Sequence, residues 1–331
     1  MSEKEKIKYS GVGGEALIEG IMMKGPYGAA MACRMPDGSI DLTRKDFKSV
    51  TDKFPILKKP FIRGPVNFVE QMLFGYKCMM ESAEKTAFDS DDMKEEEMSK
   101  LDKWLSDHFG PKMMAVIGVI AMVLGFGLAF LMFFYLPTLV TDLINDHIAH
   151  GSLDRFRPLI EGVMRMIIFV AYMWAVSQMS DIKRVFKYHG AEHKSIFCVE
   201  HGLELTVENV RKQSRFHPRC GTSFIFITII LSIVVSSIVV VVAPQIRDVR
   251  WLWIIVKLLL LPLIMSIGYE CIRIAGKHDN AFTRALSAPG LMMQRITTKE
   301  PEDDIIEVGI AAIKAVINPP EETKDETNEA E

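Results

Sequence analysis

Two stretches of the chain, residues 113–136 and 221–246, carry no charged side chain. A helix of roughly 20 apolar residues crosses a hydrocarbon core of about 30 Å, so both stretches are long enough to span a membrane. Helices in the core of a soluble protein rarely run this far without a charge, because one face usually meets water. The two stretches therefore predict membrane-spanning helices rather than buried helices of a soluble protein.

Two further apolar stretches contain isolated charges. One carries Glu161 and Arg165 near its start, and the other carries only Lys257. We interpret Glu161 and Arg165, one helical turn apart, as a pair near the outer face, and Lys257 as a side chain that snorkels outward. The predicted fold is an α-helical integral membrane protein with four transmembrane helices, at residues 113–136, 158–180, 221–243 and 251–269.

The basic residues between the predicted spans give their orientation. Segment 181–220 is rich in Lys and Arg, whereas the connection 137–157 holds only Arg155 and Arg157. Short cytoplasmic loops carry the excess of Lys and Arg. We therefore expect a multi-pass protein with both termini and segment 181–220 in the cytoplasm, and with 137–157 as an outer connection.

The overall composition adds little to this prediction of membrane topology. The net charge of −3 arises because acidic segments cancel the basic loops. The five cysteines show no CxxC spacing and lie mostly in predicted cytoplasmic or boundary positions, so we expect no disulfide framework. As partners we expect the lipid bilayer and other membrane proteins, and not nucleic acid.

The N-terminal segment, residues 1–83, predicts a small cytosolic β unit followed by an amphipathic helix from residue 60. The run Glu15–Met23 is strand-like, and Pro36-Asp37-Gly38 is a turn signal between two further strands, because Pro fixes φ and Gly accepts positive φ. This unit is too short to bury a large core of its own. We therefore expect it to dock on segment 181–220.

The remaining segments are more polar. Residues 84–112 form a charged linker, and residues 270–317 form cytosolic C-terminal helices, one of which begins after Pro301 with acidic residues in its first turn. Residues 318–331 are Pro-, Glu- and Thr-rich and predict a disordered tail.

Segment 181–220 holds the main functional motif, His189-Gly-Ala-Glu192-His193, followed by His217-Pro-Arg-Cys220. The spacing H-x-x-E-H on a helix binds metal in some zinc hydrolases. His189 and His193 are one turn apart, so both imidazoles lie on one face. Glu192 lies about 60° to one side, where its carboxylate can hold a metal-bound water and act as the catalytic base.

His217, Cys220 or both would complete the metal shell. Four protein ligands would make the metal structural, whereas three and a water would allow catalysis. Helical spacing from Ile182 to His193 predicts that the second span continues into the cytosol as one rod, which places His189 roughly 10–15 Å beyond the membrane. Thr206–Ser214 predicts a short return helix that brings His217 back toward His189.

Five ordered motifs resemble one known family. They are Gly13-Gly-Glu-Ala-Leu-Ile-Glu-Gly-Ile-Met-Met-Lys24, Phe61-Ile-Arg-Gly64, His189-Gly-Ala-Glu-His-Lys194, His217-Pro-Arg-Cys-Gly-Thr-Ser-Phe224 and Ala288-Pro-Gly-Leu-Met-Met-Gln-Arg295. Together they resemble the bacterial YqhQ-like membrane proteins, a domain family of unknown function described as predicted metal-dependent enzymes. The resemblance covers about Gly13 to Ile317 and implies a bacterial cell-membrane location and a divalent metal, with zinc as the expected ion.

Two functional hypotheses follow from the sequence. The first is a membrane metalloprotein with a cytosolic-face site that acts as a metal-dependent hydrolase. The second is a non-enzymatic membrane scaffold, or a factor that assists other membrane proteins, in which a metal is structural or absent. A transporter is less favoured, because four helices with few buried charges offer no evident pathway.

Overall fold

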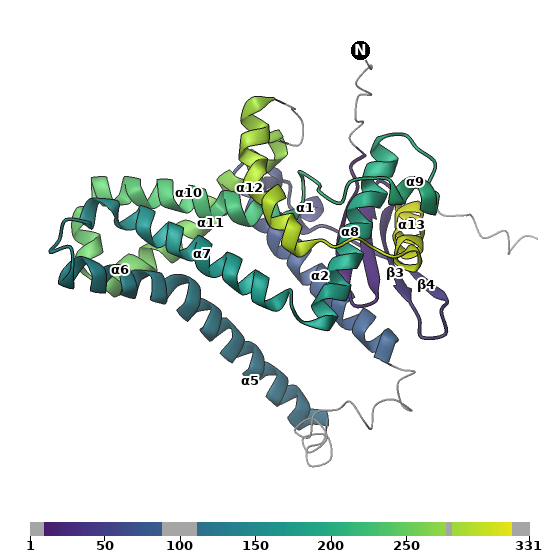
Figure 1. Cartoon of the computed structure of the whole chain (residues 1–331), viewed down its shortest axis with the longest axis horizontal. Helices are drawn as coiled ribbons and strands as arrows, with labels where there is room; N and C mark the ends of the chain where they lie inside the picture. The colour runs from purple at the N-terminus through teal and green to yellow at the C-terminus, as the bar shows by residue number, and fades with distance from the viewer. Residues whose placement is uncertain (1–9, 88–110, 276–279, 320–331) are drawn as a thin grey trace, which may run out of the picture.

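The computed structural model of the chain describes residues 10–87, 111–275 and 280–319. A bundle of long helices lies at one end of the molecule, and a small sheet covered by helices lies at the other (Figure 1). Most of the predicted charged linker lies outside the described residues, and so does almost all of the predicted tail.

A four-stranded antiparallel sheet forms the N-terminal unit, in the order β1-β2-β3-β4. The predicted turn at Pro36-Asp37-Gly38 is confirmed, with Gly38 at a φ of +84°. The run Glu15–Met23, predicted as one strand, is instead a hairpin that turns at Glu19, which has a φ of +51°. The strands are β1 (Gly13–Leu17), β2 (Gly20–Gly25), β3 (Gly28–Arg34) and β4 (Ile40–Lys45).

Helices cover both faces of this sheet. On one face, Ile21 and Met23 pack with Tyr188 in a core made with α8 (Ser180–Glu200) and α13 (Asp303–Ile317). On the other face, Met22 and Met31 pack with Cys78 of α2 (Arg63–Ala87). Alternate strand residues therefore enter different cores, which explains the nearly continuous apolar runs in β2 and β3. The expected docking of the sheet on segment 181–220 is confirmed.

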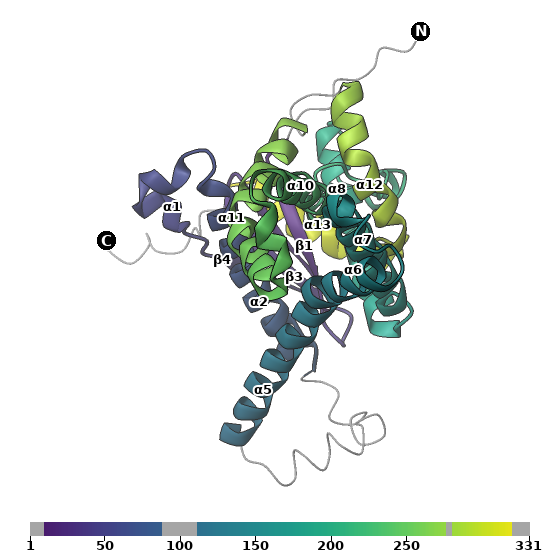
Figure 2. The ribbon, with the colours of Figure 1, turned by 90° about the vertical axis from the view of Figure 1, so that its left-hand side faces the viewer.

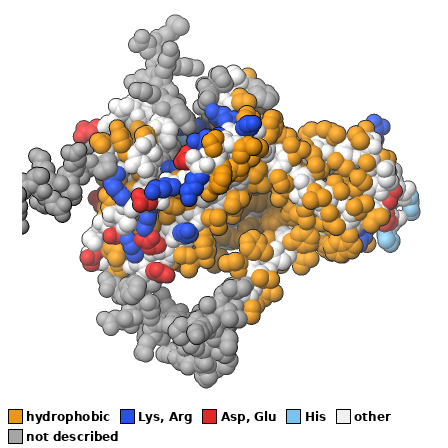
Figure 3. All heavy atoms as spheres, turned by 180° about the vertical axis from the view of Figure 1, so that it is seen from behind, with side chains coloured by type: hydrophobic (Ala, Val, Ile, Leu, Met, Phe, Trp, Pro, Cys, Tyr) orange, Lys and Arg blue, Asp and Glu red, His pale blue; other side chains and the backbone are white. Residues whose placement is uncertain are grey.

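The long helices form the other part of the molecule. Within the described residues, four helical stretches are long and apolar enough to cross a membrane: Met122–His147, Asp154–Val176, Ser223–Val242 and Arg250–Ile274. Figure 2 views this bundle from its far end, and Figure 3 shows hydrophobic side chains over its surface. The elements are α5 (Pro111–Phe130), η2 (Leu131–Tyr135), α6 (Leu136–His147), η3 (Asp154–Phe156), α7 (Arg157–Val176), α10 (Gly221–Val242), η4 (Pro244–Asp248) and α11 (Arg250–Ala275).

Short elements connect and flank these two parts. They are α1 (Val50–Lys53), η1 (Pro55–Lys58), α9 (Val207–Arg211) and α12 (Ala281–Thr297). The predicted return helix is α9, which is shorter than expected. The five cysteines all lie in the described residues, and none of them forms a disulfide.

The first apolar helix continues well beyond its predicted end at residue 136, so much of the predicted connection 137–157 is helical. Pro137 has no N–H and cannot donate to the Phe133 carbonyl, which lies four residues earlier. The π-helix η2 covers this point, and Arg165 Nε donates to the Phe133 oxygen at 2.8 Å. Pro137 therefore does not end the helix, because a side chain from α7 satisfies the free carbonyl.

The isolated charges of the bundle pair differently from the prediction. Glu161 does not pair with Arg165; its carboxylate lies 2.7 Å from Lys257 Nζ and accepts from the Trp253 indole N–H at 3.0 Å. Lys257 does not snorkel outward, because it is 6% exposed. Arg157 joins Glu161 to Asp142 of α6. The sequence predicts positions near the helix ends for Glu161 and Lys257, but both are buried and paired with each other between helices.

The predicted single rod from the second span to His193 is wrong. Helix α7 ends at Val176 and α8 begins at Ser180, with Met179 in an extended conformation between them. Ser177 donates its hydroxyl to the Trp174 carbonyl at 2.6 Å, which helps to close the end of α7. Because of this break, α8 changes direction and lies along β1 (Figure 1).

Candidate metal centre

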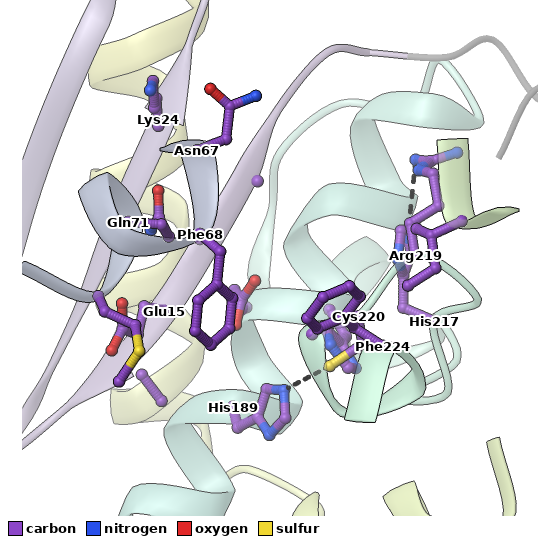
Figure 4. Close-up of a pocket in the computed structure, with 18 of the residues that line it drawn as sticks. Glu15, Lys24, Asn67, Phe68, Gln71, His189, His217, Arg219, Cys220 and Phe224 are labelled. Atoms are coloured by element: carbon purple, nitrogen blue, oxygen red, sulfur yellow. Dashed lines mark hydrogen bonds between the residues drawn. The ribbon is translucent and has the colours of Figure 1, made fainter. Parts of the chain in front are cut away.

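His189, His193 and Cys220 meet where α8 approaches the start of α10. One donor atom from each lies within 4.8 Å of the others, and His189 Nε2 lies 3.2 Å from Cys220 Sγ (Figure 4). The two rings are 4.4 Å apart between centroids, as expected for histidines one helical turn apart. Two imidazoles and one thiolate form a donor set suited to zinc, which takes nitrogen and sulfur ligands and keeps an open position in catalytic sites.

Backbone carbonyls hold the second nitrogen of both histidines. Nδ1 of His189 lies 2.8 Å from the Thr297 carbonyl, and Nδ1 of His193 lies 2.6 Å from the Arg215 carbonyl. A carbonyl can only accept, so each Nδ1 carries a hydrogen, which leaves Nε2 as the nitrogen that faces the donor group. Metal-binding histidines are oriented by such outer contacts. The residues present therefore fit a divalent cation.

Cys220 is placed where a thiolate is stabilised. It is the N-cap residue of α10, where the helix dipole favours negative charge. Burial opposes ionisation of Cys220, but the charges of His189 and His193 outweigh it and hold the pKa of the thiol well below its usual range. Burial likewise opposes charge on His189, yet the neighbouring thiolate raises the pKa of its imidazole. A bound cation would replace the proton that this pair shares.

His217 does not join the three donor atoms. Its Nε2 faces Glu200 Oε2 at 3.5 Å, and Arg219 bridges the same two side chains. Burial opposes the charge on Glu200, but the nearby imidazole of His217 and the charge of Arg219 lower its pKa to about 2. Gln294 fixes the backbone of His217 from both sides, accepting from its N–H at 2.7 Å and donating to its carbonyl at 2.8 Å.

Glu200 and Gln294 were not singled out from the sequence. Glu200 is the last residue of α8, two turns after His193. The one feature of the sequence that could have pointed to it is a carboxylate at the end of an otherwise buried helix face. Gln294 stood inside one of the quoted motifs, but no spacing rule connects it with His217. Their contacts position the loop that carries Cys220 and leave His217 outside the metal-donor group.

Glu192 lies beside the three donors, against β1. A Cβ placed on Gly14 would come within 2.9 Å of Glu192 Cγ and 2.8 Å of the Met22 carbonyl oxygen. The strand can approach the carboxylate this closely only because Gly14 has no side chain. Burial raises the pKa of Glu192, while the two histidines and the Gly14 N–H act in the opposite direction. This environment suits a carboxylate that exchanges a proton with water.

The segment after α12 closes the other side of the site. Lys299 N–H donates to the Phe186 carbonyl at 2.8 Å, and Thr297 supplies the carbonyl that holds His189. This segment crosses α8 at Gly190, where a Cβ would lie 2.0 Å from the Lys299 oxygen. The glycine of the motif is therefore required by the close approach of a distant backbone.

Gly190→Ala should destabilise the protein by about 1–3 kcal/mol, even though alanine favours a helix by roughly 1 kcal/mol, because the methyl group meets backbone that cannot rotate away. It should also weaken metal binding by shifting Thr297. Thermal unfolding and metal content of the purified protein measure both effects. Gly125→Ala is the matched control, since nothing lies within 4 Å of its Cβ position on α5. Equal stability of the two variants would contradict this account.

A cavity of about 910 Å³ opens next to the three donors. Glu15, Gln71 and Phe68 lie on one side of it and His189, Cys220 and Phe224 on the other (Figure 4). The cavity therefore joins the sheet, α2 and the ends of the long helices around one centre. A substrate held there would have direct access to His189, Glu192 and Cys220.

A protein-family model and a bacterial protein are similar to most of this chain. The family model "Protein of unknown function (DUF1385)" matches residues 59–319, which include α8, the start of α10 and the segment after α12. The chain is 37% identical over 308 residues to "Uncharacterized protein YqhQ" of Bacillus subtilis strain 168, covering 92% of each chain. No solved structure matches the chain. The chain belongs to the DUF1385 family of proteins of unknown function.

Proposed function

We propose that this protein is a multi-pass membrane hydrolase of the bacterial cell membrane, with a divalent metal, expected to be zinc, at the cytoplasmic face. The observation that carries the proposal is the meeting of two carbonyl-anchored imidazoles and a thiolate beside a buried carboxylate and a large cavity. His189, His193 and Cys220 would hold the metal. Glu192 would serve as the catalytic base.

Each residue of the site would have a separate role in hydrolysis. A divalent ion held by His189, His193 and Cys220 would supply Lewis acidity to the site. Glu192 would accept a proton from the attacking water and pass it to the leaving group. Thr297 and Arg215 keep the imidazoles oriented, and Gly14 holds the carboxylate in place.

The metal content of wild-type protein tests the proposal. The full-length chain, purified without chelators, should contain about one zinc or cobalt ion per chain after exposure to that metal alone. Mass spectrometry of the native protein and elemental analysis both measure this ratio. A ratio near zero under these conditions would exclude the proposed site.

The Lys and Arg asymmetry supports both termini and segment 181–220 on the cytoplasmic side. Ile148→Cys, at an exposed position beyond α6, should react in whole cells with a membrane-impermeant maleimide, because it would lie on the outer side. Lys212→Cys, on the exposed end of α9, should react only after the cells are opened. Wild-type protein measures the background from the five native cysteines. Labelling of Lys212→Cys in intact cells would reverse the orientation.

Covalent catalysis by Cys220 is a second candidate, favoured by the 3.2 Å contact between its sulfur and His189 Nε2. The lowered thiol pKa and the helix N-terminus are also features of cysteine nucleophiles. Cys220→His separates the two candidates. It keeps a metal ligand and should retain bound metal and part of the activity of a metal hydrolase, whereas a cysteine enzyme would lose all activity.

A further inference from the structure

The apolar side of the cavity is built from the ends of three helices that are long enough to span a membrane. Met173, Phe224 and Ile272 line it, and each lies in the terminal turn of a candidate span, on α7, α10 and α11 respectively. Phe68 and Met72 of α2 complete this side, and Met72 is 57% exposed. The apolar wall therefore lies at the level where the spans would leave the bilayer on the cytoplasmic side.

The segment before α2 brings exposed apolar side chains to the same level. Phe54, Ile56 and Phe61 are 57%, 59% and 58% exposed. The Phe61 carbonyl accepts a hydrogen bond from Ser266, which lies about two turns inside the α11 span. A segment tied to α11 at that depth, with Lys58 and Lys59 beside its aromatic residues, has the composition of an interfacial membrane anchor.

The residues just before this anchor reach the cavity, because Ser49 and Thr51 line the cavity wall. The back of the molecule is hollowed where the hydrophobic surface of the long helices meets the charged part of the chain (Figure 3). With the anchor reaching through the headgroup layer toward Ser266 and the ends of the spans beside it, the cavity would communicate with the hydrocarbon region of the cytoplasmic leaflet.

Lys24 supplies a cation on the polar side of the cavity. Its Nζ lies 3.2 Å from the centre of the Phe47 ring, and among the described residues no carboxylate lies within salt-bridge distance of it. The other cation of the cavity wall, Arg219, is paired with Glu200. Lys24 and the donors His189 and Cys220 lie on different sides of one space (Figure 4). An anionic group could therefore contact the lysine while the rest of the headgroup reaches the donors.

We propose that the cavity takes an anionic amphiphile from the cytoplasmic leaflet, whose headgroup carries a phosphate and no neutralising cation. Its apolar chain would lie against Phe68, Met72 and Ile272, and its phosphate would contact Lys24. Phosphate-bearing anionic lipids are the abundant amphiphiles of that leaflet. The proposal gives the substrate class of the hydrolase proposed above, but binding of the amphiphile does not require that the hydrolase chemistry be correct.

Photolabelling of the full-length protein tests the proposal. The probe is phosphatidylglycerol with a diazirine on its acyl chain, in a phosphatidylcholine bilayer. Mass spectrometry should locate crosslinks on cavity residues such as Met72, Met173 and Ile272. Lys24→Met should lower this cavity labelling roughly tenfold, because a charge-assisted contact is lost, and Lys24→Arg should restore most of it. Lys53→Met, an exposed lysine outside the cavity wall, should leave it unchanged.

Further experiments separate a lipid phosphate from free phosphate. They also separate binding of the amphiphile from the proposed hydrolase activity. Phosphatidylcholine with the same diazirine should label the cavity far less, and excess inorganic phosphate should not compete. Glu192→Gln should label like wild type, so that binding is measured without turnover. Crosslinks restricted to the outer faces of α5 and α10, equal labelling by both lipids, or competition by inorganic phosphate would each overturn the proposal. A cavity that binds a peptide instead of a lipid would give crosslinks only on the outer faces of α5 and α10.

Discussion

Replacing His193 with alanine should lower the metal content of the purified full-length protein from about one ion per chain to near zero. A site with three protein ligands cannot lose one and keep high affinity, and the Arg215 carbonyl that orients the imidazole would lose its partner as well. Elemental analysis measures the loss. The absorption spectrum of the cobalt-loaded protein gives an independent measure, because it reports directly on the ligands around the ion.

The companion variants make this prediction specific. His189→Ala and Cys220→Ala should show the same loss, whereas His217→Ala should keep most of the metal, because its ring faces Glu200 and Arg219. His147→Ala, an exposed histidine at the far end of α6, is the control for the substitution itself. Full metal content in His193→Ala would contradict the three-ligand site. Loss in His217→Ala with unchanged unfolding temperature would show that His217 is a fourth ligand.

Glu192→Gln should retain the metal and lower turnover by about 10²–10⁴-fold, the usual contribution of a general base. Glutamine preserves the shape that packs on Gly14 but cannot accept the proton. Turnover is measured as hydrolysis of the lipid that labels the cavity, followed by mass spectrometry. The metal content and unfolding temperature of the same preparation serve as controls.

Two outcomes would count against this role of Glu192. Loss of the metal in Glu192→Gln would make the carboxylate a ligand rather than a base. Unchanged turnover with the metal retained would remove Glu192 from the chemistry. If neither turnover nor any cellular defect depends on Glu192, while loss of His189 or Cys220 lowers folded yield, the metal is structural and the scaffold hypothesis is favoured.

The sequence by itself determined the local features of this protein. The long apolar stretches, two of them uncharged, predicted four long helices, because the length needed to cross a bilayer is fixed by the helical rise. The spacing of His189 and His193 placed two imidazoles on one face for the same reason. The turn at Pro36-Asp37-Gly38 followed from the φ preferences of its own residues. Each of these features depends on residues within a few positions of one another.

Only the tertiary structure decided which distant groups meet. Periodicity could not reveal that Lys257 pairs with Glu161, or that Arg165 satisfies the carbonyl freed by Pro137. An isolated charge in an apolar helix is equally compatible with a helix end or a buried pair. The break between α7 and α8 was also missed, since the apolar pattern continues through it while the backbone does not.

The same limit applies to the candidate site. His217 and Cys220 were equivalent as ligands in the sequence, because both stand at suitable positions near the start of α10. The fold separates them by giving His217 a buried carboxylate, Glu200, and by placing Cys220 against His189. Gly14 and Gly190 are glycines because backbone and side chains from remote segments pass within 3 Å of their Cβ positions. Local sequence fixes the helices that carry the donors, whereas contacts between segments far apart in the chain decide which donors come together.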